Sequence, residues 1–155
     1  MKISAVGQKG ISLIKRFEGF KAKPYICSGG AKTIGYGATY YPNGLRVTLS
    51  DKAITEAQAS TMLINMLGSY EKSVDSFCRD DINQNQFDAL VSFAYNVGVN
   101  ALKNSTLLKK VNKNPQDVTI RKEFLKWNKA AGKVLQGLTT RRAAEAKLYF
   151  TPCKV

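Results

Sequence analysis

Glycine is concentrated in one short part of the chain, and this concentration limits the folds that the chain can adopt. Five glycines, at positions 29, 30, 35, 37 and 44, lie among Tyr, Ile, Thr and Val residues. Residues 33–37 alternate in the manner of a short strand, Pro42-Asn43-Gly44 is a strong turn signal, and residues 46–49 can return as another strand. Residues 24–49 therefore predict a small antiparallel sheet of two or three strands.

The pattern predicts a helix before this sheet. Apolar residues recur at mostly helical spacing within residues 7–20, at Ile11, Leu13, Ile14 and Phe17. Ser4 is a candidate N-cap, and Gly19 would end the helix because glycine readily takes the left-handed conformation. Glu18 then lies in the last turn, where the helix dipole disfavours a negative charge. Two interpretations stay open: an ordinary solvated glutamate, or a carboxyl group that the local field helps to keep protonated.

The chain after the sheet is predicted to be helical. Thr55 and Gln58 form a capping-box pair before a helix of about four turns. Asn83 and Gln86 repeat the pair before a helix that is apolar on nearly all sides, as expected at the centre of a core. Further helix starts are predicted at Ser105, at Asn114-Pro115, where the following helix carries Phe124, Leu125 and Trp127, and at Thr139 or Thr140.

This order of elements predicts an α+β protein whose strands are confined to one lobe. The length of 155 residues suits one domain that buries a core without disulfides. We expect a single domain over residues 1–155, with the N-terminal helix and β-lobe at about 1–55 and the helix-rich lobe at about 56–155.

The residue types that are absent restrict the chemistry. The chain has no histidine, which removes Ser-His-Asp and Cys-His mechanisms and leaves carboxylates, a thiol, lysine or tyrosine for acid–base work. Its three cysteines, Cys27, Cys78 and Cys153, form no CxxC pair and are too few for a disulfide framework. We therefore expect neither a metal nor a cofactor.

The formal charge of +13 predicts attraction to polyanions. Nucleic acid, anionic lipid surfaces and bacterial cell walls all qualify, and charge alone does not choose among them. No recognised nucleic-acid module is present, so we expect no specific nucleic-acid partner. Residues 1–5 are not followed by the apolar stretch of a secretory leader, and no 18-residue apolar stretch predicts a transmembrane segment. We expect the protein to begin its life in a cytoplasm.

Residues 17–37 resemble the active-site region of a known family. The similar residues are Phe17-Glu18-Gly19-Phe20, Pro24-Tyr25, Cys27, Gly30 and Thr33-Ile34-Gly35-Tyr36-Gly37. They resemble the phage lysozymes of glycoside hydrolase family twenty-four, the endolysins of tailed phages. The family signature is Glu, eight residues, Asp or Cys, five residues, then Thr, and Glu18, Cys27 and Thr33 satisfy both spacings. Two later blocks, at residues 83–98 and 127–145, are similar to the central helix and the C-terminal part of that family.

The resemblance implies a lysozyme-like fold and a monomeric muramidase that cuts the β-1,4 bond between N-acetylmuramic acid and N-acetylglucosamine in peptidoglycan. It implies Glu18 as the catalytic acid, Cys27 as the second group and Thr33 as a residue that positions water or sugar. Glycoside hydrolysis needs such an acid and a second group. It also implies a holin-dependent enzyme, which waits in the host cytoplasm and then acts on the wall, where the basic surface would hold it.

Some assignments have alternatives. Cys27 is a base, a nucleophile, a buried apolar residue or a disulfide partner, and Thr33 is functional or simply a good strand residue. The resemblance pairs Arg141 with Glu18, whereas a helix arginine is otherwise solvated. Tyr36 and Asn96 are substrate-binding candidates, and Trp127 is a core residue rather than a sugar platform. Many family members have histidine where this chain has Ala38, which removes one ion pair.

Rival functions also stay open. Two lysine-rich stretches, residues 103–113 and 121–133, have interleaved apolar residues, as in membrane-active helices. A lytic transglycosylase would cut the same bond with one acid and leave an anhydro sugar. Whether the anomeric carbon inverts or is retained does not follow from the sequence.

Overall fold

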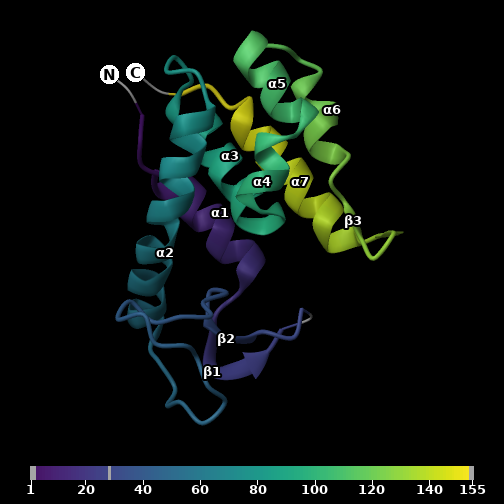
Figure 1. The fold of residues 1–155 in the computed structure, drawn as a ribbon. Helices are drawn as coiled ribbons and strands as arrows, with labels where there is room; N and C mark the ends of the chain where they lie inside the picture. The colour runs from purple at the N-terminus through teal and green to yellow at the C-terminus, as the bar shows by residue number, and fades with distance from the viewer. Residues whose placement is uncertain (1–2, 28, 154–155) are drawn as a thin grey trace. The chain divides into compact units, whose positions relative to one another are not determined.

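The fold was obtained as a computed structural model that describes residues 3–27 and 29–153 (Figure 1). Met1 and Lys2, part of the segment tested above for a leader, lie outside the described residues. The chain divides into two compact units. One unit is Ile14–Gly68, which we call the β unit, and the other joins Met1–Leu13 to Ser69–Val155, which we call the helical unit. The domain boundaries expected from the sequence stay a prediction.

The β unit contains an antiparallel hairpin, but its strands are not the pair of residues 33–37 and 46–49 expected from the sequence. Strand β1 (Lys21–Ile26) pairs with β2 (Lys32–Gly35), and Tyr25 lies opposite Thr33. Residues 46–49 form no named strand. Among these four residues, only Arg46 takes part in a β-bridge, an isolated one with Tyr40. The prediction of a small antiparallel sheet is thus confirmed with two regular strands.

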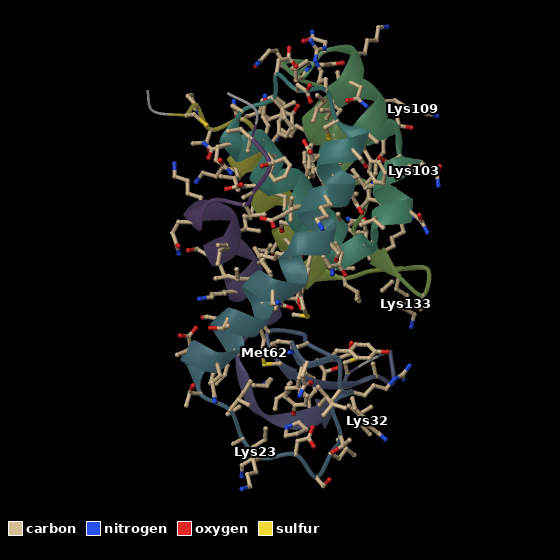
Figure 2. The ribbon with its side chains drawn as sticks, turned by 60° about the vertical axis from the view of Figure 1, so that its left-hand side comes forward. Lys23, Lys32, Met62, Lys103, Lys109 and Lys133 are labelled. Carbon is tan, nitrogen blue, oxygen red and sulfur yellow. The ribbon has the colours of Figure 1, made fainter. Side chains whose placement is uncertain are left out.

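A tight turn and an apolar cluster hold the rest of the β unit together. Gly44 has φ of 86°, the left-handed conformation that glycine adopts without strain, and its N–H donates to the Tyr41 carbonyl at 2.9 Å. This confirms the turn predicted at Pro42-Asn43-Gly44. The buried cluster consists of Ile34, Ala38, Val47 and Met62, the last of which is labelled in Figure 2. Ala38 is fully buried there, so the position often taken by histidine is apolar in this chain.

Helix α2 (Glu56–Phe77) contributes residues to both units. Its start is as predicted, because the Thr55 hydroxyl accepts from the Gln58 N–H at 3.1 Å and the Gln58 side chain accepts from the Thr55 N–H at 2.9 Å. It is 22 residues long, however, and not the four turns expected. The helical spacing of apolar residues continues beyond the expected end, at Leu67, Tyr70, Val74 and Phe77, so the pattern supports the longer helix.

Helix α3 (Gln84–Val97) is the centre of the helical unit. The predicted capping box is present at Asn83 and Gln86, and residues 85–94 are buried. Figure 1 shows α7 (Gln136–Tyr149) beside both α3 and α6 (Ile120–Leu125), and α3 and α6 each pack against α7. The short α4 (Val99–Lys103) and α5 (Thr106–Lys113) complete this unit, and Ser105 caps α5 as predicted.

The prediction for the start of α1 (Gln8–Glu18) is wrong in one respect. Ser4 does not cap this helix. Asp88, from α3, accepts hydrogen bonds from the Gly7 N–H at 3.0 Å and from the Gly10 N–H at 3.1 Å. A carboxylate from another helix therefore satisfies the first-turn donors that a local cap would have satisfied.

The C-terminal part differs from the sequence prediction in three places. Asn114-Pro115 precedes turns, and α6 begins only at Ile120. The stretch expected as a lysine-rich helix contains a hairpin of β3 (Lys129–Ala130) and β4 (Lys133–Val134). Ala131 and Gly132 both have positive φ, 51° and 77°, as a two-residue hairpin turn requires. Helix α7 begins at Gln136, before the threonines expected to cap it.

Candidate active site

Glu18 is the last residue of α1, as the sequence predicted. Gly19 follows with φ of 71°, and its N–H donates to the Lys15 carbonyl at 2.9 Å, which closes the final turn. Strand β1 begins two residues later, at Lys21. The Glu18 side chain is half-buried at the carboxyl end of the helix.

Cys27 and Thr33 face each other across the β1–β2 turn. The Cys27 N–H donates to the Ala31 carbonyl at 2.9 Å, and the Gly30 N–H donates to the Cys27 carbonyl at 2.8 Å. The Cys27 sulfur accepts hydrogen bonds from the Thr33 hydroxyl and from the N–H groups of Gly29 and Ala31, which lower the pKa of the thiol. The turn thus favours the thiolate, the reactive form of cysteine.

The Thr33 hydroxyl has two acceptors and one hydrogen. It donates to the Ala31 carbonyl at 2.9 Å, and it is also within hydrogen-bond reach of the Cys27 sulfur. When the sulfur carries a proton, the thiol donates to Thr33 and Thr33 donates to Ala31. When the sulfur is ionised, Thr33 can turn its hydrogen to the thiolate. Thr33 is 3% exposed, so water competes little with either of these two hydrogen-bond arrangements.

Tyr25 is a candidate site residue to which the sequence assigned no role. Burial and the charges on Cys27 and Glu18 raise the pKa of its hydroxyl, in that order of size. The phenol is therefore within electrostatic reach of both candidate catalytic groups. The ladder places Tyr25 opposite Thr33, and residues opposite each other in an antiparallel pair project to the same face. The alternation within β1 was the available signal for this residue.

Tyr36 is 7% exposed and holds two helices of the β unit together. Its hydroxyl donates to Glu56 at 2.7 Å, and Glu56 also accepts from Lys15, one turn before Glu18, at 3.4 Å. Ser60, Tyr36 and Lys15 lower the pKa of Glu56 to about 2, with Ser60 the largest cause. These contacts give Tyr36 a place in positioning the end of α1, while its contact with substrate stays a prediction.

Asn96 lies in the helical unit with a defined orientation. Its side-chain oxygen accepts from Arg142 Nη2 at 2.9 Å. Arg142 is fully buried, with its guanidinium 5.1 Å from the Phe93 ring centroid. No described residue accepts from the Asn96 amide nitrogen, and the side chain is exposed. The amide donors are therefore available to a ligand.

Arg141 is 4% exposed, so its interpretation as a solvated arginine is wrong. Its guanidinium donates to Glu145 at 3.3 Å and to the Ser92 carbonyl at 3.2 Å. Arg142 Nε lies 2.7 Å from the other Glu145 oxygen, off the hydrogen-bond axis, as an ion pair. Burial raises the pKa of Glu145 and lowers that of Arg142. The pairing of Arg141 with Glu18 stays a prediction.

Trp127, the cysteines and any metal ligands or membrane spans complete the set of candidate features. The rings of Trp127 and Phe93 form a T-shaped pair with centroids 5.4 Å apart, which supports the assignment of Trp127 to the core. All three cysteines are free thiols, so the disulfide interpretation of Cys27 finds no support. Within residues 3–27 and 29–153, no three Cys, Asp or Glu side chains gather as metal ligands, and no helix is long and apolar enough to cross a membrane.

Comparisons with known proteins identify the family of the chain. Residues 15–145 match the sequence model of the family described as phage lysozyme. The endolysin of Bacillus phage B103 is 44% identical over 94% of this chain, which spans 54% of that relative, about half its length. The endolysin of Salmonella phage P22 is 38% identical over 94% of this chain and 98% of its own. The muramidase domain of SpmX from Asticaccaulis excentricus has a TM-score of 0.81 at 33% identity, covering 97% of this chain and all of its own.

The match covers most of the chain and includes Glu18, Cys27 and Thr33. The chain belongs to the phage lysozyme family, and its fold is the lysozyme-like α+β fold.

Proposed function

We propose that this protein is an endolysin that hydrolyses the β-1,4 bond between N-acetylmuramic acid and N-acetylglucosamine in peptidoglycan, and so lyses the host cell. The observation that carries the proposal is a stabilised Cys27 thiolate beside Tyr25, whose hydroxyl also responds to the charge on Glu18. Relatives named endolysin and muramidase support the same activity.

In the proposed mechanism Glu18 donates its proton to the leaving glycosidic oxygen as the bond to the anomeric carbon breaks. The Cys27 thiolate is the second group. As a base it would take a proton from water while the resulting hydroxide adds to the anomeric carbon. As a nucleophile it would form a carbon–sulfur bond that water later hydrolyses. The NMR signal of the first-formed anomer separates these routes, because one displacement inverts the carbon and two retain it.

Glu18→Gln tests the assignment of the acid. Glutamine has nearly the same shape but cannot donate a proton in this way, so the turnover of purified peptidoglycan should fall roughly a thousandfold. Asp80→Asn, which removes an exposed carboxylate in the helical unit, is the matched control and should keep full activity. Circular dichroism would verify folding, and full activity of the Glu18→Gln variant would overturn the assignment. Product masses should contain one added water per bond, which a lytic transglycosylase would not add.

Cys27→Ser and Cys27→Asp test the second group. Serine keeps the size but is not ionised near neutral pH, so its turnover should drop by about a hundredfold. Aspartate restores an anion that the Thr33 hydroxyl and the two backbone N–H groups can stabilise, so it should recover much of the loss. Unchanged turnover in Cys27→Ser would remove the thiol from the mechanism.

Substrate contact is proposed for the Asn96 amide, and a positioning role for Tyr36. The protein is proposed to act as a monomer without cofactor, to stay in the host cytoplasm until a holin opens the membrane, and then to reach the wall.

A basic surface would hold the enzyme at the wall. Figure 2 shows Lys103, Lys109 and Lys133 projecting on one side of the helical unit. Among the described residues none of the three makes an ion pair, whereas Lys110 and Lys126 are both bound by Glu123 at 3.1 and 3.0 Å.

A further inference from the structure

The β unit contains a cavity of about 470 Å³ that the catalytic proposal does not use. Its walls come from the turn after β1 and from the two arms of the Gly44 hairpin. The lining residues are Gly30, Ala31, Lys32, Thr39, Tyr40, Arg46, Val47 and Thr48. All of them belong to residues 14–68, so the cavity is complete within one unit.

The two cations of this cavity have no acidic partner among the described residues. Lys32 is exposed at the start of β2, and Arg46 is exposed on the second arm of the hairpin. The Arg46 guanidinium lies 5.3 Å from the centroid of the Tyr40 ring, its partner in the isolated bridge. A cation over an aromatic face is held in place while its N–H donors remain available.

The nearest acid in the sequence, Asp51, borders the cavity without lining it, and its carboxylate accepts from the hydroxyl of the lining residue Thr48. Asp51 accepts hydrogen bonds from the Thr48 N–H at 2.8 Å and from the Tyr41 hydroxyl at 2.6 Å. It does not line the cavity, and no lining residue carries a negative charge. Two threonines line the cavity, and the Thr48 hydroxyl donates to Asp51, which leaves the Thr39 hydroxyl for a ligand. Two cations, this hydroxyl and an aromatic ring are the chemistry that recognises a carboxylate on a partly apolar chain.

The cavity shares a loop with the candidate active site. Ala31 lines the cavity, and its N–H stabilises the Cys27 thiolate. A ligand in the cavity would therefore be attached to, or lie beside, a sugar that reaches Cys27. Where a peptide is attached, the lactyl carboxyl group of N-acetylmuramic acid is part of an amide bond and carries no charge. The carboxylates of such a strand are therefore those of the peptides.

We propose that this cavity binds a carboxylate of the peptide attached to the glycan strand, through Lys32 and Arg46, with Tyr40 holding Arg46 in place. The proposal rests on the proposed hydrolase function and assigns part of the substrate to this cavity. It makes the enzyme selective for strands that carry peptides.

The test compares two substrates made from one preparation. Peptidoglycan is first freed of attached phosphate polymers, so that peptide carboxylates are its main anions. One half is then treated with an amidase that removes the peptides, and the lactyl carboxylates that this hydrolysis exposes on N-acetylmuramic acid are converted to neutral methylamides, so that the glycan stays intact and uncharged. Release of reducing ends gives kcat/KM for the wild type, Lys32→Gln, Arg46→Gln and the double variant on each substrate.

The double variant should lose about tenfold in kcat/KM on the peptide-bearing substrate, as expected for the loss of two charge-assisted contacts, and should equal the wild type on the stripped glycan. Lys23→Gln is the matched control, because it removes the same charge from the same unit outside the cavity. Figure 2 shows Lys23 and Lys32 pointing away from each other. This control should behave as wild type on both substrates.

Two results would overturn the inference. An equal loss on both substrates would assign the cavity to sugar or to the fold, and no loss on either would leave it without a substrate role. Arg46→Lys, which keeps the charge, should retain more peptide selectivity than Arg46→Gln. Failure of the hydrolase function itself would appear differently, as no reducing ends from either substrate in the wild type.

Discussion

At the scale of single residues, the unusual feature is a thiol where many family members have a carboxylate. Three hydrogen-bond donors lower the pKa of Cys27, whereas burial raises the pKa of Cys78 to about 12. Two cysteines of one chain therefore have opposite reactivities, and the difference comes from donors and solvent, not from the side chain itself.

This contrast predicts the pattern of alkylation. Iodoacetamide should modify Cys27 with a rate midpoint below that of an ordinary thiol, because only the thiolate reacts. Thr33→Val removes the largest of the stabilising hydrogen bonds, so the pKa should rise and the midpoint should move to higher pH. Peptide mapping by mass spectrometry against pH measures both, with Cys78 as the slow internal standard. A midpoint unaffected by Thr33→Val would show that the hydroxyl does not stabilise the thiolate.

Some site residues could be predicted from local sequence and others could not. The spacing of Glu18, Cys27 and Thr33 could be recognised because all three lie in one short segment, at the end of one helix and in one hairpin. Tyr25 lies in the same segment, but nothing in its spacing says that its hydroxyl responds to two catalytic charges. The buried state of Arg141 depends on Ser92 and Glu145, and the alternative of a solvated arginine was therefore not excluded by the sequence.

At the scale of elements, α1 depends on α3 for its first turn. Asp88 accepts from Gly7 and Gly10, which lie 81 and 78 residues earlier. The contact is close: a Cβ on Gly10 would lie 2.6 Å from Val6 Cγ1 and 2.7 Å from Asp88 Cβ. Glycine at this position serves packing, because its helical backbone needs no special conformation.

Two glycine-to-alanine substitutions in helices should therefore act in opposite directions. Gly68→Ala, in α2, meets no atom within 4 Å and should raise the free energy of unfolding by about 0.5–1 kcal/mol through helix propensity. Gly10→Ala should lower it by about 1–3 kcal/mol, because the steric overlap exceeds that gain. Urea denaturation monitored by circular dichroism measures both. Stabilisation by Gly10→Ala would contradict the close packing of α1 on Asp88.

At the scale of the whole molecule, the net charge of +13 governs encounter with the wall. Attraction between exposed charges is screened by salt, with a Debye length of about 8 Å at physiological ionic strength. Lys103, Lys109 and Lys133 are exposed and contribute to this attraction, whereas the buried Arg141 and Arg142 are neutralised in part by Glu145.

The expected consequence is a salt-dependent rate of wall lysis. The initial rate of turbidity loss should fall severalfold between low and physiological salt. A Lys103→Gln, Lys109→Gln, Lys133→Gln variant should be slower at low salt and less sensitive to added salt. The corresponding triple arginine variant keeps the charge and should retain the wild-type salt dependence. Identical salt curves for the glutamine variant and the wild type would assign the attraction to other cations.

The sequence by itself determined the features that short segments specify. Capping boxes, glycines with positive φ and apolar periodicity act over a few residues, and they predicted α3, the start of α2, the end of α1, strand β2 and the turn at Gly44, but not strand β1. Only the tertiary structure decided which distant groups meet: Asp88 at the start of α1, Arg142 against Asn96, and Lys32 with Arg46 around one cavity. The physical reason is that hydrogen bonds and charges act over a few ångströms in space, while the residues that make them are separated along the chain by up to about eighty positions.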